Sequence, residues 1–293
     1  MKVLNFGSLN IDYTYCVDRF VQPGQTKACK ELRKGAGGKG LNQSVALAMA
    51  GAQVYHAGLI GQGGAFLRTA LSDSGVDCGY LAESKAQSGH AVIQLEESGQ
   101  NCILLYPGTN FELTEAYIDR VLSHFSAGDI LLLQNETNQI PYLIEQAAAR
   151  GLRVALNAAP MTGDVQSYPL DKLSWLIVNE DEGAALSGKT EAGEIAGELA
   201  RRYPNLAIVL TLGADGVIYR QGSLDLYVPA RHVDPVDTTG AGDTFTGYFL
   251  AAVADGADAA YAMTFATAAA ALAIQKPGAA ASVPTLEEVL KAL

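Results

Sequence analysis

The feature that most constrains the fold is a series of short apolar segments separated by helical stretches in the second half of the chain. The segments at 129–134, 153–158, 175–179 and 206–213 are almost continuously apolar. A strand buried on both faces has this pattern, whereas a half-exposed strand alternates. Intervening helices place successive strands in parallel. We therefore expect an α/β fold with three α/β/α layers, built on a doubly wound, mostly parallel sheet.

Two earlier stretches do not fit this sheet. The residues on either side of the turn VQPGQT alternate in polarity, and residues 89–108 alternate around the turn ESGQ. Such alternation is typical of hairpins that expose one face. We expect them to form a small β-sheet lid, from roughly residues 12–34 and 89–107, within a single domain that covers residues 1–293.

Composition excludes several classes of partner. The formal net charge is −11, and no basic run interrupts the acidic balance, so neither nucleic acid nor an anionic membrane is an expected partner. The longest apolar run, 262–274, is too short to cross a bilayer. The four cysteines have no metal-ligand spacing, and the opening residues lack a signal-peptide pattern. We expect free thiols and a cytoplasmic protein.

The stretch GAGGKG at 35–40 formally matches a dinucleotide-binding fingerprint, but its context is wrong. It follows the polar sequence ACKELRK rather than a buried strand, and no acid lies about 20 residues further on. It also fails the P-loop pattern, because Gly40 stands where Ser or Thr must bind magnesium. We interpret it as a glycine-rich turn that carries Lys39 at the start of a helix. The alternative is a surface turn with a solvated lysine.

Polar side chains follow two of the expected strands. Asn10 and Asp12 come after the apolar residues that open the chain, and their spacing of two puts both on one face. Glu136 comes directly after the strand at 129–134. Ligands of open α/β sheets bind beyond the carboxyl ends of the strands, and these groups suit sugar hydroxyls. A local Asx turn is the alternative for Asn10 and Asp12.

Asn179 and Glu182 lie three residues apart where a strand passes into a helix. Their oxygens could hold a hydrated Mg²⁺, which uses few protein carboxylates and keeps several waters. The alternative is an acidic helix N-terminus stabilised by the helix dipole. Residues 211–216, TLGADG, form a strand end and tight turn that could contact a phosphate or a base.

The stretch VDTTGAGDTFTGYFLAAV at 236–253 carries the clearest chemistry. The turn Gly240-Ala241-Gly242 opens a long apolar helix, and helix-terminal amides favour an anion. Asp243 follows at once, although a carboxylate repels phosphate. Simple helix capping is one explanation. The other is phosphoryl transfer, in which the amides stabilise the phosphoryl charge while the carboxylate takes a proton from an attacking hydroxyl.

The motifs GSLNID, GAGGKGLNQ, NEDE, TLGADG and DTTGAGDTF occur together in the order and rough spacing of one family. The chain resembles the ribokinase-like (PfkB-type) carbohydrate kinases along essentially its full length, and in its motifs it is most similar to the ribokinases. The resemblance implies that Asp243 is the general base that activates a sugar hydroxyl toward the γ-phosphate of ATP. It also implies that Gly240, Ala241 and Gly242 form the anion hole.

The same resemblance implies the binding residues. Those for the sugar would be Asn10, Asp12, Gly38, Lys39, Asn42 and Glu136. Those for ATP would be Asn179, Glu182, Thr211, Gly213 and Gly216, with Glu182 acting indirectly on Mg²⁺. A monovalent cation, K⁺, would be held by Asp237, Thr239, Ala273, Lys276, Gly278 and Ser282, mostly through backbone carbonyls. A homodimer formed through the lids is a further implication.

Three places depart from the family pattern. The chain reads GQGGAF at 61–66 where relatives have G-x-D-x-x-G, Gln25 stands where an acid is usual, and Asn135 replaces an apolar residue. All three border the expected sugar pocket, so they bear on which sugar is bound.

The reaction that the resemblance implies is phosphorylation of a primary hydroxyl, with D-ribose as substrate and ribose 5-phosphate as product. Deoxyribose, fructose, a sugar acid or a nucleoside stay open, and a non-catalytic sensor is a remote alternative because the base and anion hole are both present.

Overall fold

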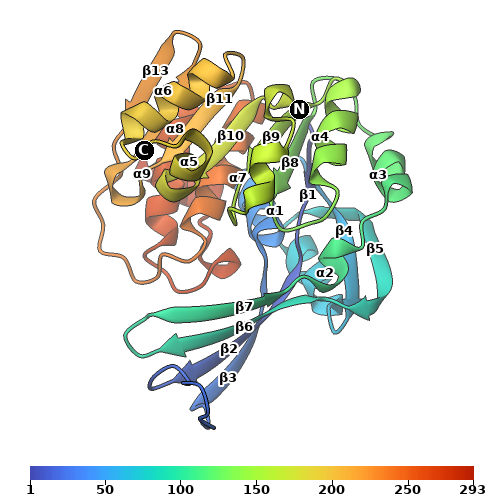
Figure 1. Ribbon diagram of the computed structural model, residues 1–293, viewed down its shortest axis with the longest axis vertical. Coiled ribbons are helices and arrows are strands. Elements are labelled where there is room, and N and C mark those ends of the chain that lie inside the picture. Colours follow the sequence, from blue (N-terminus) through green and yellow to red (C-terminus); the bar gives the residue numbers. More distant parts are fainter.

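A nine-stranded sheet forms the centre of the computed structural model, which describes residues 1–293 (Figure 1). All neighbouring strands are parallel except at one edge, where β12 is antiparallel to both of its neighbours. In spatial order the strands are β13 (Leu224–Val228), β12 (Val217–Gln221), β11 (Ala207–Thr211), β10 (Trp175–Asn179), β9 (Arg153–Asn157), β8 (Ile130–Gln134), β1 (Val3–Phe6), β4 (Val54–Gln62) and β5 (Asp77–Gln87).

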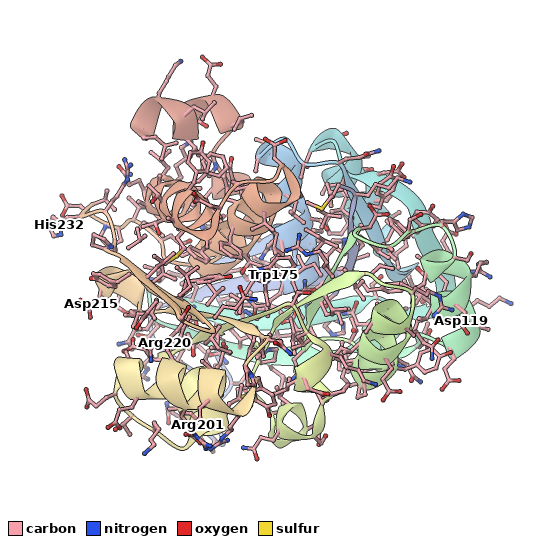
Figure 2. The ribbon with its side chains drawn as sticks, turned by 90° about the horizontal axis from the view of Figure 1, so that it is seen from above. Asp119, Trp175, Arg201, Asp215, Arg220 and His232 are labelled. Carbon is pink, nitrogen blue, oxygen red and sulfur yellow. The ribbon has the colours of Figure 1, made fainter.

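Helices cover both faces of this sheet, so the predicted three-layer α/β/α fold is confirmed (Figure 2). Because side chains alternate along each strand, Val3 enters one apolar core and Leu4 the other. One face is covered by α1 (Lys39–Met49), α2 (Ala65–Asp73), α7 (Ala241–Ala254), α8 (Ala259–Ala273) and α9 (Leu286–Ala292). The other is covered by α3 (Glu115–Leu122), α4 (Ile140–Ala149), α5 (Glu180–Ser187) and α6 (Ala192–Arg202).

A second sheet of four strands projects from this body, at the bottom of Figure 1. Its order is β3 (Glu31–Gly37), β2 (Asn10–Val17), β6 (Gly89–Glu96) and β7 (Asn101–Tyr106). Two antiparallel hairpins meet in it through the parallel pair β2 and β6. The chain passes from β1, an interior strand of the main sheet, into β2 through residues 7–9, so a short connection joins the lid to the main sheet.

The glycine-rich stretch differs from its prediction as a single turn. Residues 35–37 continue strand β3, and only Gly38, with φ 94°, makes the turn into α1. Gly40, the last glycine of the stretch, serves close packing instead. A Cβ on Gly40 would lie 2.3 Å from the backbone nitrogen of Ser8, so the start of α1 rests directly on the loop after β1. This contact fixes where Lys39 and the first turn of α1 lie.

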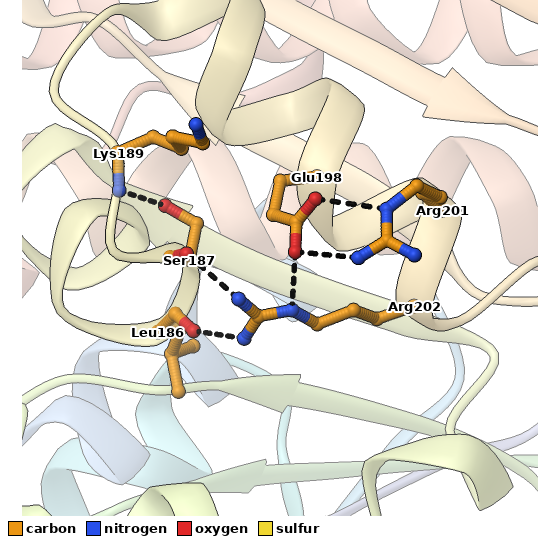
Figure 3. Close-up of polar contacts among 6 residues, drawn as sticks. All are labelled: Leu186, Ser187, Lys189, Glu198, Arg201 and Arg202. Carbon is orange, nitrogen blue, oxygen red and sulfur yellow. Dashed lines mark hydrogen bonds and ion pairs between the residues drawn. The ribbon is translucent and has the colours of Figure 1, made fainter.

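An arginine on α6 holds the C-terminal end of α5 (Figure 3). The guanidinium of Arg202 donates to the carbonyl oxygens of Leu186 and Ser187 at 2.9 and 2.8 Å. Glu198 accepts from Arg201 and Arg202, and these hydrogen bonds lower the pKa of Glu198 to about 2. The bonds from Arg202 tie α6 to the end of α5 that is opposite to Asn179 and Glu182.

Candidate functional site

The N-terminus of α7 is built to receive an anion. Gly240 precedes the helix with φ 77°, and a Cβ there would lie 2.8 Å from the side chain of Ala279. The backbone amides of Gly242 and Asp243 have no hydrogen-bond acceptor within the chain, as expected in the first turn of a helix. These free amides and the helix dipole together favour a negative group in front of Gly240.

The Asp243 carboxylate lies in the same helical turn and is held from α1. The Nδ2 atom of Asn42 donates to its Oδ2 at 2.9 Å, and Nε2 of Gln43 donates to its Oδ1 at 2.8 Å. Only 7% of Asp243 is exposed. Sequence reasoning did not single out Gln43. Its one signal was an amide beside Asn42 in an otherwise apolar helix, LNQSVALAMA.

Lys39 lies among three carboxylates at the start of α1. Burial opposes its charge, but the carboxylates of Asp243, Glu136 and Glu182 outweigh this effect and raise the pKa of Lys39. The ammonium therefore stays charged. Lys39 lines a cavity of about 160 Å³ that also contains the free amides of α7. A cation and helix-terminal amides on one cavity provide two independent means of binding a phosphate.

The expected sugar residues lie where β2 meets α1. Asn10 and Asp12 both belong to β2, and the carboxylate of Asp12 lies against Gly37 of β3, where a Cβ would be 2.0 Å from Asp12 Oδ2. Burial, together with the nearby charge of Glu136, raises the pKa of Asp12 to about 6. Gly38 lies at the turn into α1, beside Asn10.

Glu136 anchors this corner to the rest of the site. Its Oε2 accepts hydrogen bonds from the backbone nitrogen of Lys39, at 3.0 Å, and from the hydroxyl of Ser8. Burial and the charge of Asp243 raise the pKa of Glu136, although hydrogen bonds from Ser8 and Lys39 oppose this. Asn110 is a further residue that sequence reasoning missed. Its Nδ2 donates to Asn10 Oδ1 at 2.8 Å and so turns the amino group of Asn10 away from itself.

Asn179 and Glu182 form a capping box at the start of α5. The Oδ1 of Asn179 accepts from Glu182 N at 2.8 Å, and Oε2 of Glu182 accepts from Asn179 N at 3.0 Å. The local alternative of helix capping is therefore what these side chains do. Both residues nevertheless line the cavity beside Lys39, and the second carboxylate oxygen of Glu182 has no hydrogen-bond donor. One carboxylate oxygen without a hydrogen bond, on a residue that lines the cavity, suits a hydrated Mg²⁺, which needs few protein ligands.

A larger cavity of about 390 Å³ opens beyond the anion-binding turn, on the other side of β11 from α5. Thr211 is shared by the two cavities, and Gly213 and Gly216 line the larger one. Sequence reasoning missed most of its walls, which are largely apolar and come from the segment after β13 and from α7 and α8: Ala230, Arg231, His232, Val233, Phe245, Thr267, Ala270, Ala271 and Ile274. In Figure 2, His232 and Asp215 lie at the open edge of the molecule at this end of the sheet. An apolar slot beside a phosphate site suits a planar base.

Asp237 joins the two loops expected to hold K⁺. Its Oδ1 accepts from Thr239 N at 2.9 Å, and its Oδ2 accepts from Gly278 N at 2.8 Å. Burial opposes ionisation, but the hydrogen bonds from Thr239 and Gly278 lower the pKa of Asp237. Ser282 is buried in the second loop, whereas the Lys276 side chain turns outward to Glu288, which leaves only its backbone for a cation. Ala273 lies at the end of α8, directly before this loop. A carboxylate surrounded by backbone carbonyls suits a hard monovalent cation.

The three departures have different surroundings. The side chain of Asn135 donates to Pro160 O at 2.8 Å and accepts from Tyr168 OH at 2.7 Å. Gln25 is exposed in the turn between β2 and β3. Gly63, within the 61–66 stretch, does face the lid, where a Cβ would lie 3.4 Å from Ile11.

No three His, Cys, Asp or Glu side chains converge into a metal-binding group. None of the helices has the length and apolar character needed to cross a membrane. The four cysteines are free thiols, as predicted.

Comparison with known proteins gives one consistent family. The family profile described as "pfkB family carbohydrate kinase" matches residues 1–286. The ribokinase of Haemophilus influenzae is 34% identical over 98% of this chain and 96% of its own length, and that of Bacillus subtilis is 33% identical over 97% and 96%. The deoxyribokinase of Salmonella typhi is 28% identical over 98% and 97%.

A solved structure agrees with these sequences. The Arabidopsis thaliana ribokinase, whose structure is complexed with ribose and ATP, superposes with a TM-score of 0.88 and is 31% identical. The match covers 99% of this chain and 97% of the plant protein. The large mostly parallel sheet and the small separate sheet are thus both shared with a protein of known structure.

Proposed function

The chain belongs to the pfkB family of carbohydrate kinases, and on that premise we propose that it transfers the γ-phosphate of ATP to the primary hydroxyl of D-ribose, giving ribose 5-phosphate. The observation that carries this proposal is the position of Asp243. Its carboxylate lies in the first turn of α7, beside unpaired helix amides and within the electrostatic reach of Lys39. A base and an anion site in one helical turn is the equipment that phosphoryl transfer to a hydroxyl requires.

In the proposed reaction, Asp243 accepts the proton of the attacking hydroxyl while that oxygen forms a bond to the γ-phosphorus. The bond from phosphorus to the ADP oxygen breaks in line with it. The amides of Gly242 and Asp243 and the ammonium of Lys39 stabilise charge on the transferred group. Asn10, Asp12 and Glu136 would hold the other hydroxyls, so that only one oxygen faces the base.

Two cations fit residues of this site. The free oxygen of Glu182 would hold Mg²⁺ through water, and Asp237 with the loop carbonyls of residues 239 and 273–282 would hold K⁺. Mg²⁺ neutralises phosphate charge when it is bound, and K⁺ adds positive potential beside the anion-binding turn. Dependence on ATP supports a cytoplasmic location for the enzyme.

Among the alternative substrates, a sugar acid fits least well. An acid would need a free arginine near the lid, and both candidates are engaged. Arg33 pairs with Glu31 at 2.7 Å, and Arg68 donates to the carbonyl oxygens of Cys78 and Leu81. The polar set of Asn10, Asp12 and Glu136 favours a ligand with several hydroxyls, which is a reason to place ribose before deoxyribose.

The test is ADP release from MgATP, with and without K⁺, in the presence of ribose, deoxyribose, fructose, a sugar acid or a nucleoside. We expect K⁺-stimulated turnover with ribose. Asp243→Asn should lower kcat by about 10³-fold, the scale typical of removing a general base. Turnover confined to another sugar would refute ribose as the substrate and leave the mechanism standing. Full activity in Asp243→Asn would refute the mechanism.

We also propose a homodimer formed through the lids. Ile103 and Leu105 of β7 are 56% and 40% exposed, and the strand register puts them on the same lid face as Asp12. A second lid laid on this face would bury apolar surface and close the sugar side of the site. Light scattering should give twice the chain mass for the wild type and a monomer for Ile103→Glu. A monomeric wild type at micromolar concentration would rule the dimer out.

A further inference from the structure

A line of fully buried polar side chains runs beneath the neighbouring strands β8, β1 and β4 of the main sheet and ends at Asp243. Its members are His56 of β4, Ser44 and Gln43 of α1, Asn5 of β1 and Gln134 of β8, and each has essentially no exposed surface. Buried polar groups are costly unless every link is satisfied, and an apolar core would serve packing equally well. This network therefore calls for a role beyond filling space.

The direction of each hydrogen bond can be worked out from the far end. Nε2 of His56 lies 3.2 Å from the carbonyl oxygen of Gly7, which can only accept, so Nε2 carries the proton. Burial lowers the pKa of His56 to about 4, and the ring is neutral at pH 7. Its Nδ1 must then accept, and the hydroxyl of Ser44, 2.8 Å away, must donate to it.

The next hydrogen bonds lead from Ser44 through Asn5 and Gln134 to Gln43. With its proton directed to His56, Ser44 Oγ accepts from Asn5 Nδ2 at 2.8 Å, which leaves Asn5 Oδ1 to accept from Gln134 Nε2 at 3.0 Å. Gln134 Nε2 also donates to Gln43 Oε1 at 2.7 Å. Each side-chain amide in the line thus has one permitted orientation, and the carbonyl oxygen of Gly7, at the far end of the line, sets it.

The last link fixes how Gln43 meets the base. Because Gln43 Oε1 is occupied by Gln134, Nε2 must point to Asp243 Oδ1, at 2.8 Å. A flipped Gln43 would set oxygen against the carboxylate and nitrogen against nitrogen at Gln134. The amide of Asn42 is oriented by its bond to Asp243 Oδ2 alone, because its own Oδ1 has no hydrogen-bond partner. One carboxylate oxygen therefore meets an amide that is itself held from behind, while the other meets an amide without such support.

We infer that Gln43, oriented by Gln134, is a positioning residue that holds the Asp243 carboxylate in the plane needed to take the proton of the sugar hydroxyl. This inference rests on the proposed kinase function. A carboxylate has about four acceptor positions, so the bond to Gln43 leaves room for the substrate hydroxyl. Gln43 is fully buried and lines neither of the two cavities. It acts through Asp243 alone.

The competing explanation is that the network only joins β1, β4, β8 and α1. That explanation predicts a loss of folded protein with unchanged turnover per active site. Positioning predicts folded protein with a lower turnover per active site, because a misplacement of about 1 Å at the reacting atoms can cost a factor of about 100 in rate. The two explanations separate in the split between kcat and KM, measured on protein titrated for active sites.

The experiment compares Gln43→Met, Gln134→Met and the double variant with the wild type in the ADP-release assay. We expect kcat to fall about 10- to 100-fold in Gln43→Met while KM for ribose stays within about threefold, since only a transition-state interaction is lost. Gln134→Met should lose less, and the double variant should be no slower than Gln43→Met, because both changes remove one linked interaction.

Two further variants complete the design. Gln43→Glu keeps the shape of the side chain but sets a second carboxylate against Asp243, so it should be at least as slow as Gln43→Met; it also serves if Gln43→Met does not fold. Tyr117→Phe is the matched control, because it removes a buried hydroxyl bonded to Gly58 and Tyr80 on the other face of the sheet. It should lower stability and leave kcat unchanged.

The outcomes separate the proposed kinase function from the positioning role of Gln43. A wild type that turns over no sugar or nucleoside would refute the proposed function. An active wild type with unchanged kcat in Gln43→Met or Gln43→Glu would overturn the positioning role and leave the kinase intact. A multiplicative loss in the double variant would also overturn it, because independent effects would then explain both single variants.

Discussion

Acid should weaken this fold through one buried histidine. His56 lies inside β4 with its ring fully buried, between the hydroxyl of Ser44 and the carbonyl oxygen of Gly7. Burial lowers the pKa of His56 from 6.5 to about 4, although the hydrogen bond to Gly7 opposes the shift. The imidazole must therefore be neutral for the chain to fold as observed.

The change in the free energy of unfolding follows, in sign and size, from the difference in the pKa of His56 between the folded and the unfolded chain. As the pH falls, the unfolded chain gains a proton on His56 near pH 6.5, whereas the folded chain gains it only near pH 4. The unfolded state binds more protons in this window, so the free energy of unfolding falls with falling pH and is unaffected above the window. The two pKa values differ by about 2.5, which amounts to about 3 kcal/mol of unfolding free energy in all. About 2 kcal/mol of this is lost between pH 7.5 and pH 5.

Urea unfolding of the wild type and of His56→Gln, at pH 7.5, 6 and 5, measures this contribution. Glutamine can donate to Gly7 O and accept from Ser44, yet it does not titrate. Subtracting the two curves removes the effect of other groups, including Asp12, whose raised pKa acts in the opposite direction. We expect the wild type to lose about 2 kcal/mol more than the variant over this range. Parallel curves would refute the argument that His56 is neutral and inaccessible to protons in the folded state.

Two other changes have defined outcomes. Since burial and Glu136 raise the pKa of Asp12 to about 6, the KM for ribose should rise about tenfold from pH 7.5 to pH 5 if the ionised form binds the sugar. Initial-rate measurements check this, and an Asp12→Asn variant whose KM changes equally with pH would contradict it. Gly40→Ala should destabilise the fold by about 1–3 kcal/mol, because its Cβ would lie 2.3 Å from Ser8 N. Gly193→Ala, where no atom lies within 4 Å, should instead be neutral or stabilising in the same urea titration.

The parts of the site that depend on neighbouring residues could be predicted from the sequence. A glycine turn that opens an apolar helix sets its own geometry, so the segment 240–243 predicted a helix N-terminus with an acid in its first turn, and α7 has one. The buried strands of the parallel sheet were predictable for the same reason, because continuous apolar residues carry their own signal. The resemblance then supplied the roles of individual residues.

The remaining parts depend on contacts between distant residues. Gln43 and Gln134 are separated by 91 positions, and Asn10 and Asn110 by 100, so no local pattern pairs them. Residues 35–37 were expected in a turn, yet they pair with β2 as a strand, because ladder hydrogen bonds outweigh the low strand preference of glycine. The capping-box bonds of Asn179 and Glu182 likewise needed side-chain geometry to be seen.

The order of elements along the chain has a consequence for biosynthesis. β1 is made before its partners β4 and β8, whereas the helices α7 and α8, which complete the same apolar core, are made only after every strand of the main sheet. At typical elongation rates, roughly 5–20 s separate β8 from α7, and the nascent chain exposes an apolar sheet surface during that time. Chaperones that shield such surfaces would act in this interval. The base arrives with α7, so a nascent chain cannot consume ATP before its fold is nearly complete.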